Sequence, residues 1–464
     1  MKYPNAQITF YGGAGEVTGA NMVFEYKTQE RTTRIMLDCG LIQGKEMYGE
    51  RNFEKFPYDV KSIDALAVSH GHIDHIGRVP KLVKEGYEGP IYSSKPTKAL
   101  AEIMLVDSRG VMLKEIRRRK QPELYSPYDI GRTLGQWHTL EYHQEVRVKD
   151  VDIKLYRSGH ILGGAMIELS FPGSDGTVRK LVYTGDLGHP QNLLLNDTEQ
   201  LESVDFLLIE SVYGDRDHED RSKRVHLFED VIEDTIRRGG TLMIPAFSVE
   251  KTQELLFEIN EMVEHGRIPE VPVFLDSPLA IKVTRIFKRF AEYFNPEVQK
   301  IIQHDEDIFR FPGFTPTLRT EESKSINDVS PPKIIIAGSG MSNGGRILHH
   351  EKRYLSDEKS TILFTGYQTP GSLGRLIQEG SREVTIHGET IPVRCHIVTI
   401  GGYSSHRDST ALLEYAHHNV DSVKEVFVVL GEQRSSMFLA QRLRDYVGVM
   451  ASVPEQGSTH ILEI

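Results

Sequence analysis

Three histidines and one aspartate lie within six residues, directly after the strand-like run Asp64–Ser69. They are His70, His72, Asp74 and His75, and imidazole and carboxylate groups are ligands that suit zinc or a similar divalent ion. Alternate residues of an extended loop point to the same side, so His70 and His72 can share an ion while Asp74 and His75 face a neighbouring position. The fold must therefore bring further ligands to the end of this strand, because one such cluster does not complete two metal shells.

Cysteine is scarce in this chain, which limits the kind of metal site that it can build. The 464 residues include two cysteines, Cys39 and Cys395, and 19 histidines. Two thiols are too few for a disulfide framework or a thiolate zinc module, so the ligands must be histidines and carboxylates. The low count also suits a reducing cytosol, and we expect a cytoplasmic protein.

Charge and hydropathy argue against two other classes of protein. The chain has 55 Lys and Arg against 66 Asp and Glu, a net charge of −11. This balance argues against an open basic surface that coats nucleic acid, although it allows a basic cleft. No stretch approaches 18 uninterrupted apolar residues, and the start of the chain lacks a signal-peptide pattern, so we expect no membrane span.

Short apolar runs that end in a polar residue recur along the first half of the chain. Two of them place further ligand candidates at strand ends, each directly after a glycine: His160 and Asp186. Functional groups at strand ends are typical of α/β folds and sandwiches. Helical spacing of apolar residues over 96–120, 222–238 and 250–265 separates some of these strands, which predicts an α/β protein.

The pattern changes near Ser211. From there to about residue 395 it becomes rich in helices, with buried strands of the parallel type at Gly239–Pro245, Val271–Asp276 and Lys333–Ala337. This change predicts a second, Rossmann-like domain.

The metal-ligand pattern resembles that of a known fold. His-x-His-x-Asp-His, with a later Gly-His and a later Gly-Asp, is similar to the metallo-β-lactamase fold. Further segments resemble the β-CASP RNA-processing nucleases, the group of the pre-mRNA 3′-end cleavage endonuclease and its compact bacterial relatives. These segments are Gly12-Gly-Ala-Gly-Glu-Val-Thr-Gly19, Leu37-Asp-Cys-Gly40, Glu210-Ser-Val-Tyr-Gly-Asp215, Pro245-Ala-Phe-Ser248, Leu275-Asp-Ser-Pro278, Gly338-Ser-Gly-Met-Ser-Asn-Gly-Gly-Arg346 and Gly401-Gly-Tyr-Ser-Ser-His406. The resemblance covers nearly the whole chain, from about residue 7 to Ile464.

The resemblance implies an α/β architecture in which a β-CASP domain is inserted into a metallo-β-lactamase domain. The expected αββα sandwich has its first part at residues 1–210 and its C-terminal part at residues 396–464. The inserted Rossmann-like β-CASP domain is expected at residues 211–395.

The resemblance also implies two zinc ions. The expected ligands are His70, His72 and His160 for one ion and Asp74, His75 and Asp186 for the other, with Asp186 bridging the two. Asp38 is expected to orient the ligands, since metal-bound imidazoles generally require such a partner.

Three residues are expected to be catalytic: Asp74, Glu210 and His406. Glu210 matches the first acidic residue of the β-CASP domain, and His406 matches its histidine. A histidine beside a carboxylate keeps its proton near neutral pH and can deliver it to a leaving oxygen. Spacing alone does not show that the fold brings Glu210 and His406 together.

A glycine-rich segment invites two interpretations. Gly340-Met-Ser342-Asn-Gly344 fits the nucleophile elbow of α/β-hydrolases. The family resemblance favours a glycine-rich turn at the start of a helix that holds a substrate phosphate, and a plain tight turn remains open as well. The phosphate-binding candidates are Ser339, Gly340, Gly344, Arg346 and Ser404, and Ser404 is as well explained as a residue that caps a turn.

One position departs from the family pattern. Relatives that cleave RNA usually carry a final histidine ligand in a Val-His-Gly-Glu segment, and this chain has Leu430 there. DNA-directed members of the superfamily also carry an aliphatic residue at this position. Leu430 therefore leaves open the occupancy of the second metal site and the preference for RNA over DNA.

The sequence as a whole predicts a cytoplasmic zinc-dependent ribonuclease that cleaves single-stranded RNA with metal-activated water. The alternatives are a DNA-directed β-CASP nuclease and a nucleic-acid-binding subunit with weakened catalysis. A homodimer is possible. The sequence does not decide between endonuclease and exonuclease action, and it does not give the physiological substrate.

Overall fold

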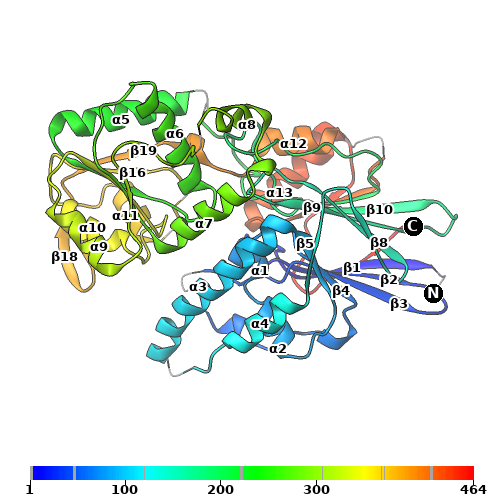
Figure 1. Ribbon diagram of the computed structural model, residues 1–464. Helices are drawn as coiled ribbons and strands as arrows, with labels where there is room; N and C mark the ends of the chain where they lie inside the picture. Colours follow the sequence, from blue (N-terminus) through cyan, green and yellow to red (C-terminus); the bar gives the residue numbers. More distant parts are fainter. Residues whose placement is uncertain are drawn as a thin grey trace. The chain divides into compact units, whose positions relative to one another are not determined.

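The chain folds into two compact units, one inserted into the other (Figure 1). The first unit comprises Met1–Asp217 and His406–Ile464, and the second comprises His218–Ser405. The computed structural model describes residues 4–44, 49–119, 121–219, 223–305, 307–366, 368–369, 371–418 and 422–464.

The inserted unit begins and ends later in the chain than the limits expected from the sequence. Those limits were residues 211 and 395, whereas the compact unit runs over His218–Ser405. The segment after β11 (Phe206–Glu210) stays with the first unit, where Tyr213 forms a parallel bridge with Asp408. At the other end, β19 (His396–Thr399) pairs with a strand of the second unit's sheet. Both limits therefore depend on backbone pairing between segments that are far apart in the chain, which a local sequence pattern does not show.

Two seven-stranded sheets form the first unit. The first sheet has the order β22 (Thr459–Leu462), β1 (Asn5–Gly12), β2 (Asn21–Lys27), β3 (Thr32–Leu37), β4 (Ala65–Ala67), β5 (Ile91–Ser94) and β6 (Trp137–Leu140). The second has the order β21 (Ala451–Ser452), β20 (Glu425–Val429), β11, β10 (Val178–Tyr183), β9 (Ala165–Pro172), β8 (Val151–Arg157) and β7 (Glu145–Val148).

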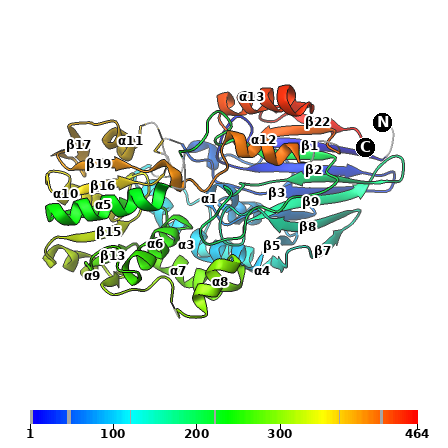
Figure 2. The ribbon, with the colours of Figure 1, turned by 90° about the horizontal axis from the view of Figure 1, so that it is seen from above.

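Helices cover the outer faces of both sheets. The first sheet is covered by α1 (Ile73–Ile76), α2 (Val79–Lys84), α3 (Lys95–Arg119) and α4 (Pro127–Gly135), and the second by α12 (Ser409–His417) and α13 (Gln433–Arg442) (Figures 1 and 2). The core between the sheets includes Phe24 and Leu37 of the first sheet and Ile167 and Phe427 of the second. These four layers confirm the αββα sandwich predicted from the sequence.

Residue patterns explain how the strands lie in this sandwich. In β8, buried and partly exposed residues alternate from Val151 to Leu155, as the two-residue period of a strand with one covered face requires. In β11 all five residues are buried, because this strand pairs in parallel with β10 and β20 and is covered on both faces.

The second unit is built on a parallel six-stranded sheet. Its order is β14 (Phe314–Pro316), β13 (Val273–Asp276), β15 (Lys333–Ala337), β12 (Thr241–Pro245), β16 (Thr361–Phe364) and β19. The strands predicted from the sequence correspond to β12, β13 and β15, and every residue of β12 and β15 is buried. A parallel sheet with helical crossovers is the expected Rossmann-like arrangement.

Helices lie between most of the successive strands of this unit. They are α5 (Arg224–Arg238), α6 (Lys251–Glu264), α7 (Pro278–Arg289), α8 (Pro296–Ile302), α9 (Thr320–Ser325), α10 (Ile347–Tyr354) and α11 (Leu373–Gln378), and a hairpin of β17 (Glu383–Ile386) and β18 (Glu389–Pro392) precedes β19. Ile347 and Ile377 pack α10 and α11 onto the sheet. Among the described residues, no helix is both long and apolar enough to cross a membrane.

Candidate active site

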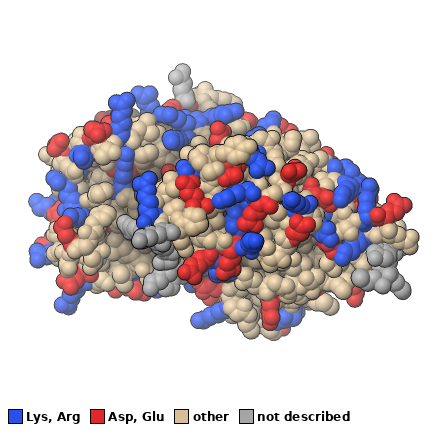
Figure 3. Space-filling view, turned by 90° about the horizontal axis from the view of Figure 1, so that it is seen from below, with Lys and Arg blue, Asp and Glu red and all other residues tan. Residues whose placement is uncertain are grey.

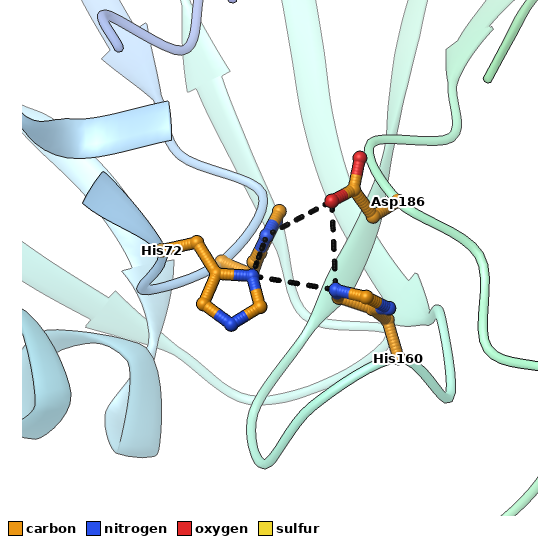
Figure 4. A group of neighbouring side chains, drawn as sticks. His72, His160 and Asp186 are labelled. Carbon is orange, nitrogen blue, oxygen red and sulfur yellow. Dashed lines mark hydrogen bonds and ion pairs between the residues drawn. The ribbon is translucent and has the colours of Figure 1, made fainter. Parts of the chain in front are cut away.

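Strand ends from both sheets of the first unit deliver one group of candidate metal ligands. His70 and His72 lie between β4 and α1, His160 follows β8, and Asp186 follows β10. One ligand atom from each of these four residues lies within 4.8 Å of the others. Figure 4 shows His72, His160 and Asp186 turned toward one another. The structure thus brings together the candidates that the sequence places at strand ends.

The chemistry of this donor set fits a divalent metal ion. His72 Nδ1 lies 3.0 Å from His70 Nε2 and 3.3 Å from His160 Nε2, and Asp186 Oδ2 lies 3.4 and 3.5 Å from the same two Nε2 atoms. Burial, and after it neighbouring imidazoles, lowers the pKa of His72 and His160 well below the usual range. Neutral imidazole is the form that binds metal, so three ring nitrogens and one carboxylate oxygen converge as zinc ligands do.

Asp38 holds the ring of His75 in place. The carboxylate is fully buried and accepts hydrogen bonds from the Ser69 backbone N–H (2.7 Å), the Ser69 hydroxyl (2.7 Å) and the Tyr183 hydroxyl (2.8 Å). Its Oδ2 also lies 2.7 Å from His75 Nδ1. His75 Nε2 lies 3.4 Å from Asp186 Oδ1. Burial alone would lower the pKa of His75, but the Asp186 and Asp38 carboxylates raise it well above the usual range. Among the described residues, this Nε2 atom has no hydrogen-bond partner.

Asp74 lies in the first turn of α1, two residues after His72. Burial raises the pKa of its carboxyl, although the neighbouring His75 opposes this shift. Among the described residues, Asp74 belongs to neither group of potential ligands whose atoms lie within 4.8 Å of one another, and His75 also lies outside both groups. The assignment of Asp74 and His75 to a second zinc ion stays a prediction.

The second group joins Asp186 to Glu210 and His406, again within 4.8 Å. Glu210 is the last residue of β11 and is fully buried. Its Oε1 accepts a hydrogen bond of 2.7 Å from the Leu187 N–H and lies 3.2 Å from His406 Nδ1. An antiparallel bridge between Gly188 and His406 brings the histidine to this position. Two residues that are 196 positions apart therefore form the pair that the spacing alone did not establish.

The environment of His406 favours its protonated form. Burial alone would lower its pKa, but the Glu210 carboxylate, together with Asp186, raises the pKa of His406 to about 9. The His406 ring lies 4.5 Å, between centroids, from that of the ligand candidate His160. A protonated imidazole thus lies beside the candidate metal ligands.

The predicted phosphate-binding residues lie in the second unit. Ser339, Gly340, Gly344 and Arg346 lie between β15 and α10. The Ser339 N–H donates to the Gly344 carbonyl over 3.1 Å, which closes the loop on itself. Ser404 follows the short turn Gly401–Tyr403 and is buried. Phosphate binding by these residues stays a prediction.

Arg346 is engaged by groups of its own unit. Its Nη1 donates to Asp276 Oδ1 (2.7 Å) and to the Thr317 carbonyl (2.9 Å), and its Nη2 donates to the Leu318 carbonyl (2.9 Å). Asp276 is fully buried, and its Oδ2 also lies 2.7 Å from His350 Nε2. The guanidinium therefore fixes the start of α10 to the end of β13.

Ser342 lacks the exposure of a nucleophile elbow. Its φ of 56° is the left-handed conformation of such a turn, but only 1% of the residue is exposed. The hydroxyl donates to the Glu351 carboxylate of α10 rather than pointing to solvent. These contacts argue against the hydrolase interpretation of Gly340–Gly344.

A buried acid in α10, Glu351, makes the stability of the protein dependent on pH. Glu351 is fully buried, and this burial raises its pKa from 4.5 to about 7, although the Ser342 hydroxyl opposes the shift. The folded state holds the proton of Glu351 more tightly than the unfolded state does. The contribution of this proton to the free energy of unfolding is therefore complete below about pH 4.5 and is lost as the pH rises through about 7. We expect Glu351→Gln to be more stable than wild type at pH 8, by about 3 kcal/mol, and to differ little from it at pH 4.5.

Thermal unfolding of both proteins at the two pH values measures this effect. The matched control is Glu270→Gln, which removes an exposed carboxylate. An equal midpoint for wild type and Glu351→Gln at pH 8 would contradict the buried-acid interpretation.

Sequence reasoning missed several residues that support the site. The hydroxyl groups of Tyr183 and Ser69 donate to Asp38, and Asp276 accepts a hydrogen bond from Arg346. Ser69 directly precedes the histidine cluster, and Tyr183 lies in the strand that leads to Asp186. Their hydroxyl groups near ligand candidates were the available signal, but the same residues are common in ordinary strands.

The sandwich and its cluster of histidines and aspartate at strand ends define a metal-dependent hydrolase of the metallo-β-lactamase class. Three family models match in chain order: the metallo-beta-lactamase superfamily domain over residues 28–212, the Beta-Casp domain over 252–377, and the Zn-dependent metallo-hydrolase RNA specificity domain over 390–454. A ribonuclease from Thermus thermophilus is 36% identical over 438 residues, which cover 94% of this chain and 96% of that protein. The chain belongs to the β-CASP family of metallo-β-lactamase-fold proteins.

Other relatives extend over most of the chain. An RNase J-like protein from Methanocaldococcus jannaschii is 31% identical over 459 residues, covering 97% of this chain and 98% of that one. The transcription termination factor FttA of Methanosarcina mazei is 31% identical over 455 residues, covering 94% of this chain and 68% of that protein. A crystal structure of a protein of unknown function from Enterococcus faecalis shares the fold, with a TM-score of 0.54 and 12% identity over 99% of this chain and all of that one. The predicted family, fold and metal-dependent hydrolase class are confirmed.

Proposed function

We propose that this chain is a zinc-dependent phosphodiesterase that cleaves single-stranded RNA. The observation that carries the proposal is the pairing of two groups through Asp186: the ligand candidates His70, His72 and His160 on one side, and Glu210 with His406 on the other. The names of relatives, a ribonuclease and an RNase J-like protein, support RNA as the substrate.

The residues divide the chemistry between them. When bound, zinc would activate a water molecule and neutralise charge on a phosphodiester oxygen. His70, His72, His160 and Asp186 would hold one ion, and Asp74 and His75 would share a second with Asp186. His406 would then deliver its proton to the leaving oxygen, while Glu210 keeps the imidazole charged and in position.

The surface charge is consistent with local recognition of the substrate. On the face shown in Figure 3, Lys and Arg side chains are interleaved with Asp and Glu. The net charge of −11 agrees with this mixture. This face therefore offers no broad basic area, and we expect RNA to bind near the strand ends that carry the candidate site residues.

Leu430 motivates a second candidate, a DNA-directed nuclease or a binding subunit with weakened catalysis. Leu430 follows β20 with a φ of 52°, is fully buried, and packs in the core between the sheets. Its side chain adds no metal ligand. The convergence of four other ligand candidates favours an active enzyme over a binding subunit.

Cleavage of matched single strands tests the proposal. Zinc-loaded protein is expected to cleave RNA labelled at its 5′ or 3′ end faster than DNA of the same sequence, and a chelator should stop the reaction because the ligands cannot activate water without metal. Comparison of the two labels separates endonuclease from exonuclease action. If zinc-loaded protein leaves both RNA and DNA intact, the nuclease proposal is wrong. Faster cleavage of DNA would favour the DNA-directed nuclease.

A cytoplasmic location and a homodimer are further parts of the proposal. Cys39 and Cys395 are both free and buried, which suits a reducing compartment. Size-exclusion chromatography with light scattering would determine the oligomeric state.

A further inference from the structure

An exposed aromatic ring lies at one edge of the second unit's sheet. Phe247 follows β12, and 41% of it is exposed. Among the residues described in this unit, no other aromatic residue belongs to the exposed large apolar side chains. A single exposed apolar side chain is common, so a role for Phe247 must follow from its surroundings.

The ring rests on the bare backbone of two neighbouring loops. A Cβ atom added to Gly340 would lie 2.8 Å from Phe247 Cδ2 and 2.9 Å from Cε2, and one added to Gly366 would lie 3.8 Å from Cε2. Side chains at Gly340 would therefore displace the ring. The two glycines let the loops after β15 and β16 support Phe247 directly.

Buried hydrogen bonds hold this support in place. The side-chain amide of Gln368 donates to the carbonyls of Gly340 (2.9 Å) and Gly366 (3.2 Å), and the residue is almost fully buried. The Phe247 carbonyl accepts from the Thr252 N–H (3.2 Å) and the Thr252 hydroxyl (2.7 Å). These hydrogen bonds hold the backbone of Phe247, Gly340 and Gly366, while the ring remains accessible.

The position of the ring in the fold points to a ligand. Phe247, Gly340 and Gly366 all follow the carboxyl ends of adjacent parallel strands, the edge at which open α/β sheets bind their ligands. Small neutral groups lie at the same edge: the Ser277 and Ser248 hydroxyls lie 3.6 and 3.9 Å from the place a Cβ would take on Gly338. A flat apolar face at an edge of the sheet that also carries hydroxyl groups matches a nucleobase with its ribose better than a wholly apolar partner.

We propose that Phe247 is the stacking platform for one nucleobase of a single-stranded RNA substrate. The proposal rests on the proposed ribonuclease function and adds a contact to it. Base stacking on an aromatic ring tolerates any sequence, because every base has a flat π face. Gln368 acts as a positioning residue, because its amide holds the two glycines that contact the ring.

Binding measured with RNA that lacks single bases tests the stacking directly. The parent protein carries His406→Ala, which leaves the ligand candidates for zinc in place and slows cleavage during the measurement. Fluorescence anisotropy with a labelled RNA decamer gives Kd for this parent and for added Phe247→Ala, Phe247→Trp and, as the matched control, Phe438→Ala. Phe438 is an exposed phenylalanine of α13 in the first unit.

We expect Phe247→Ala to weaken binding about tenfold, whereas Phe247→Trp and Phe438→Ala bind like the parent. Abasic decamers, each without one base, should reveal a position whose base matters to the parent and no longer matters after Phe247→Ala. An unchanged Kd, or an equal loss for intact and abasic RNA, would overturn the platform while leaving the proposed function intact, provided that wild type cleaves the same RNA. Failure of wild type to bind or cleave RNA would instead overturn both.

Discussion

His72→Ala is expected to lose most of the bound zinc and to cleave RNA at least about a thousandfold more slowly than wild type. The reason is the central place of His72 in the ligand group. Its Nδ1 atom lies within 3.3 Å of the Nε2 atoms of both His70 and His160. Alanine leaves two histidines and Asp186, and the remaining ligand atoms no longer surround one point.

Zinc content by mass spectrometry and cleavage of end-labelled RNA measure the two effects together. The matched control is His226→Ala, which removes an exposed histidine from α5. This control should keep both zinc and activity. Full zinc content and full activity in His72→Ala would show that the group of four residues is not the metal site.

The grouping of the candidate metal ligands was the most predictable part of this molecule. His70, His72, His160 and Asp186 all follow strands, and each strand has a local apolar pattern that marks where it ends. Because strand ends gather at the edges of sheets, local patterns were enough to nominate the group. The same patterns predicted an α/β protein, and the layers of the sandwich followed from the family resemblance.

Contacts between distant segments were not predictable from the residues alone. The pair of Glu210 and His406 depends on the bridge between Gly188 and His406, which joins segments far apart in the chain. The engagement of Arg346 with Asp276 likewise arises only when two parallel strands are placed side by side. A local pattern records which face of a strand is buried, but it does not record which strand becomes the neighbour.

The supporting polar network around Asp38 illustrates the same limit. Any buried carboxylate must be satisfied by hydrogen bonds, so partners for Asp38 were to be expected in general. Ser69 reaches Asp38 because β3 and β4 pair in one sheet, and Tyr183 reaches it because the second sheet packs on the first. The need for hydrogen-bond partners of Asp38 was therefore predictable, whereas the fold determined which residues are those partners.

The second large effect is expected at His406. Replacement by alanine should lower kcat for RNA cleavage by about 10²- to 10⁴-fold without loss of zinc, because a positioned general acid contributes about that much. Glu210→Gln should lower kcat in the same direction by a smaller factor, since the neutral amide no longer stabilises a protonated imidazole at 3.2 Å.

A change of leaving group separates proton donation from a merely structural role. A thiolate leaves without a proton, so RNA with sulfur in place of the bridging 3′ or 5′ oxygen at one linkage should recover most of its cleavage rate in His406→Ala. His72→Ala should not recover on the same substrate, because its defect lies in metal binding rather than in the leaving group. Equal losses on oxygen and sulfur substrates for His406→Ala would contradict the general-acid role. Such losses would leave His406 as a residue that only shapes the site around Asp186 and Glu210.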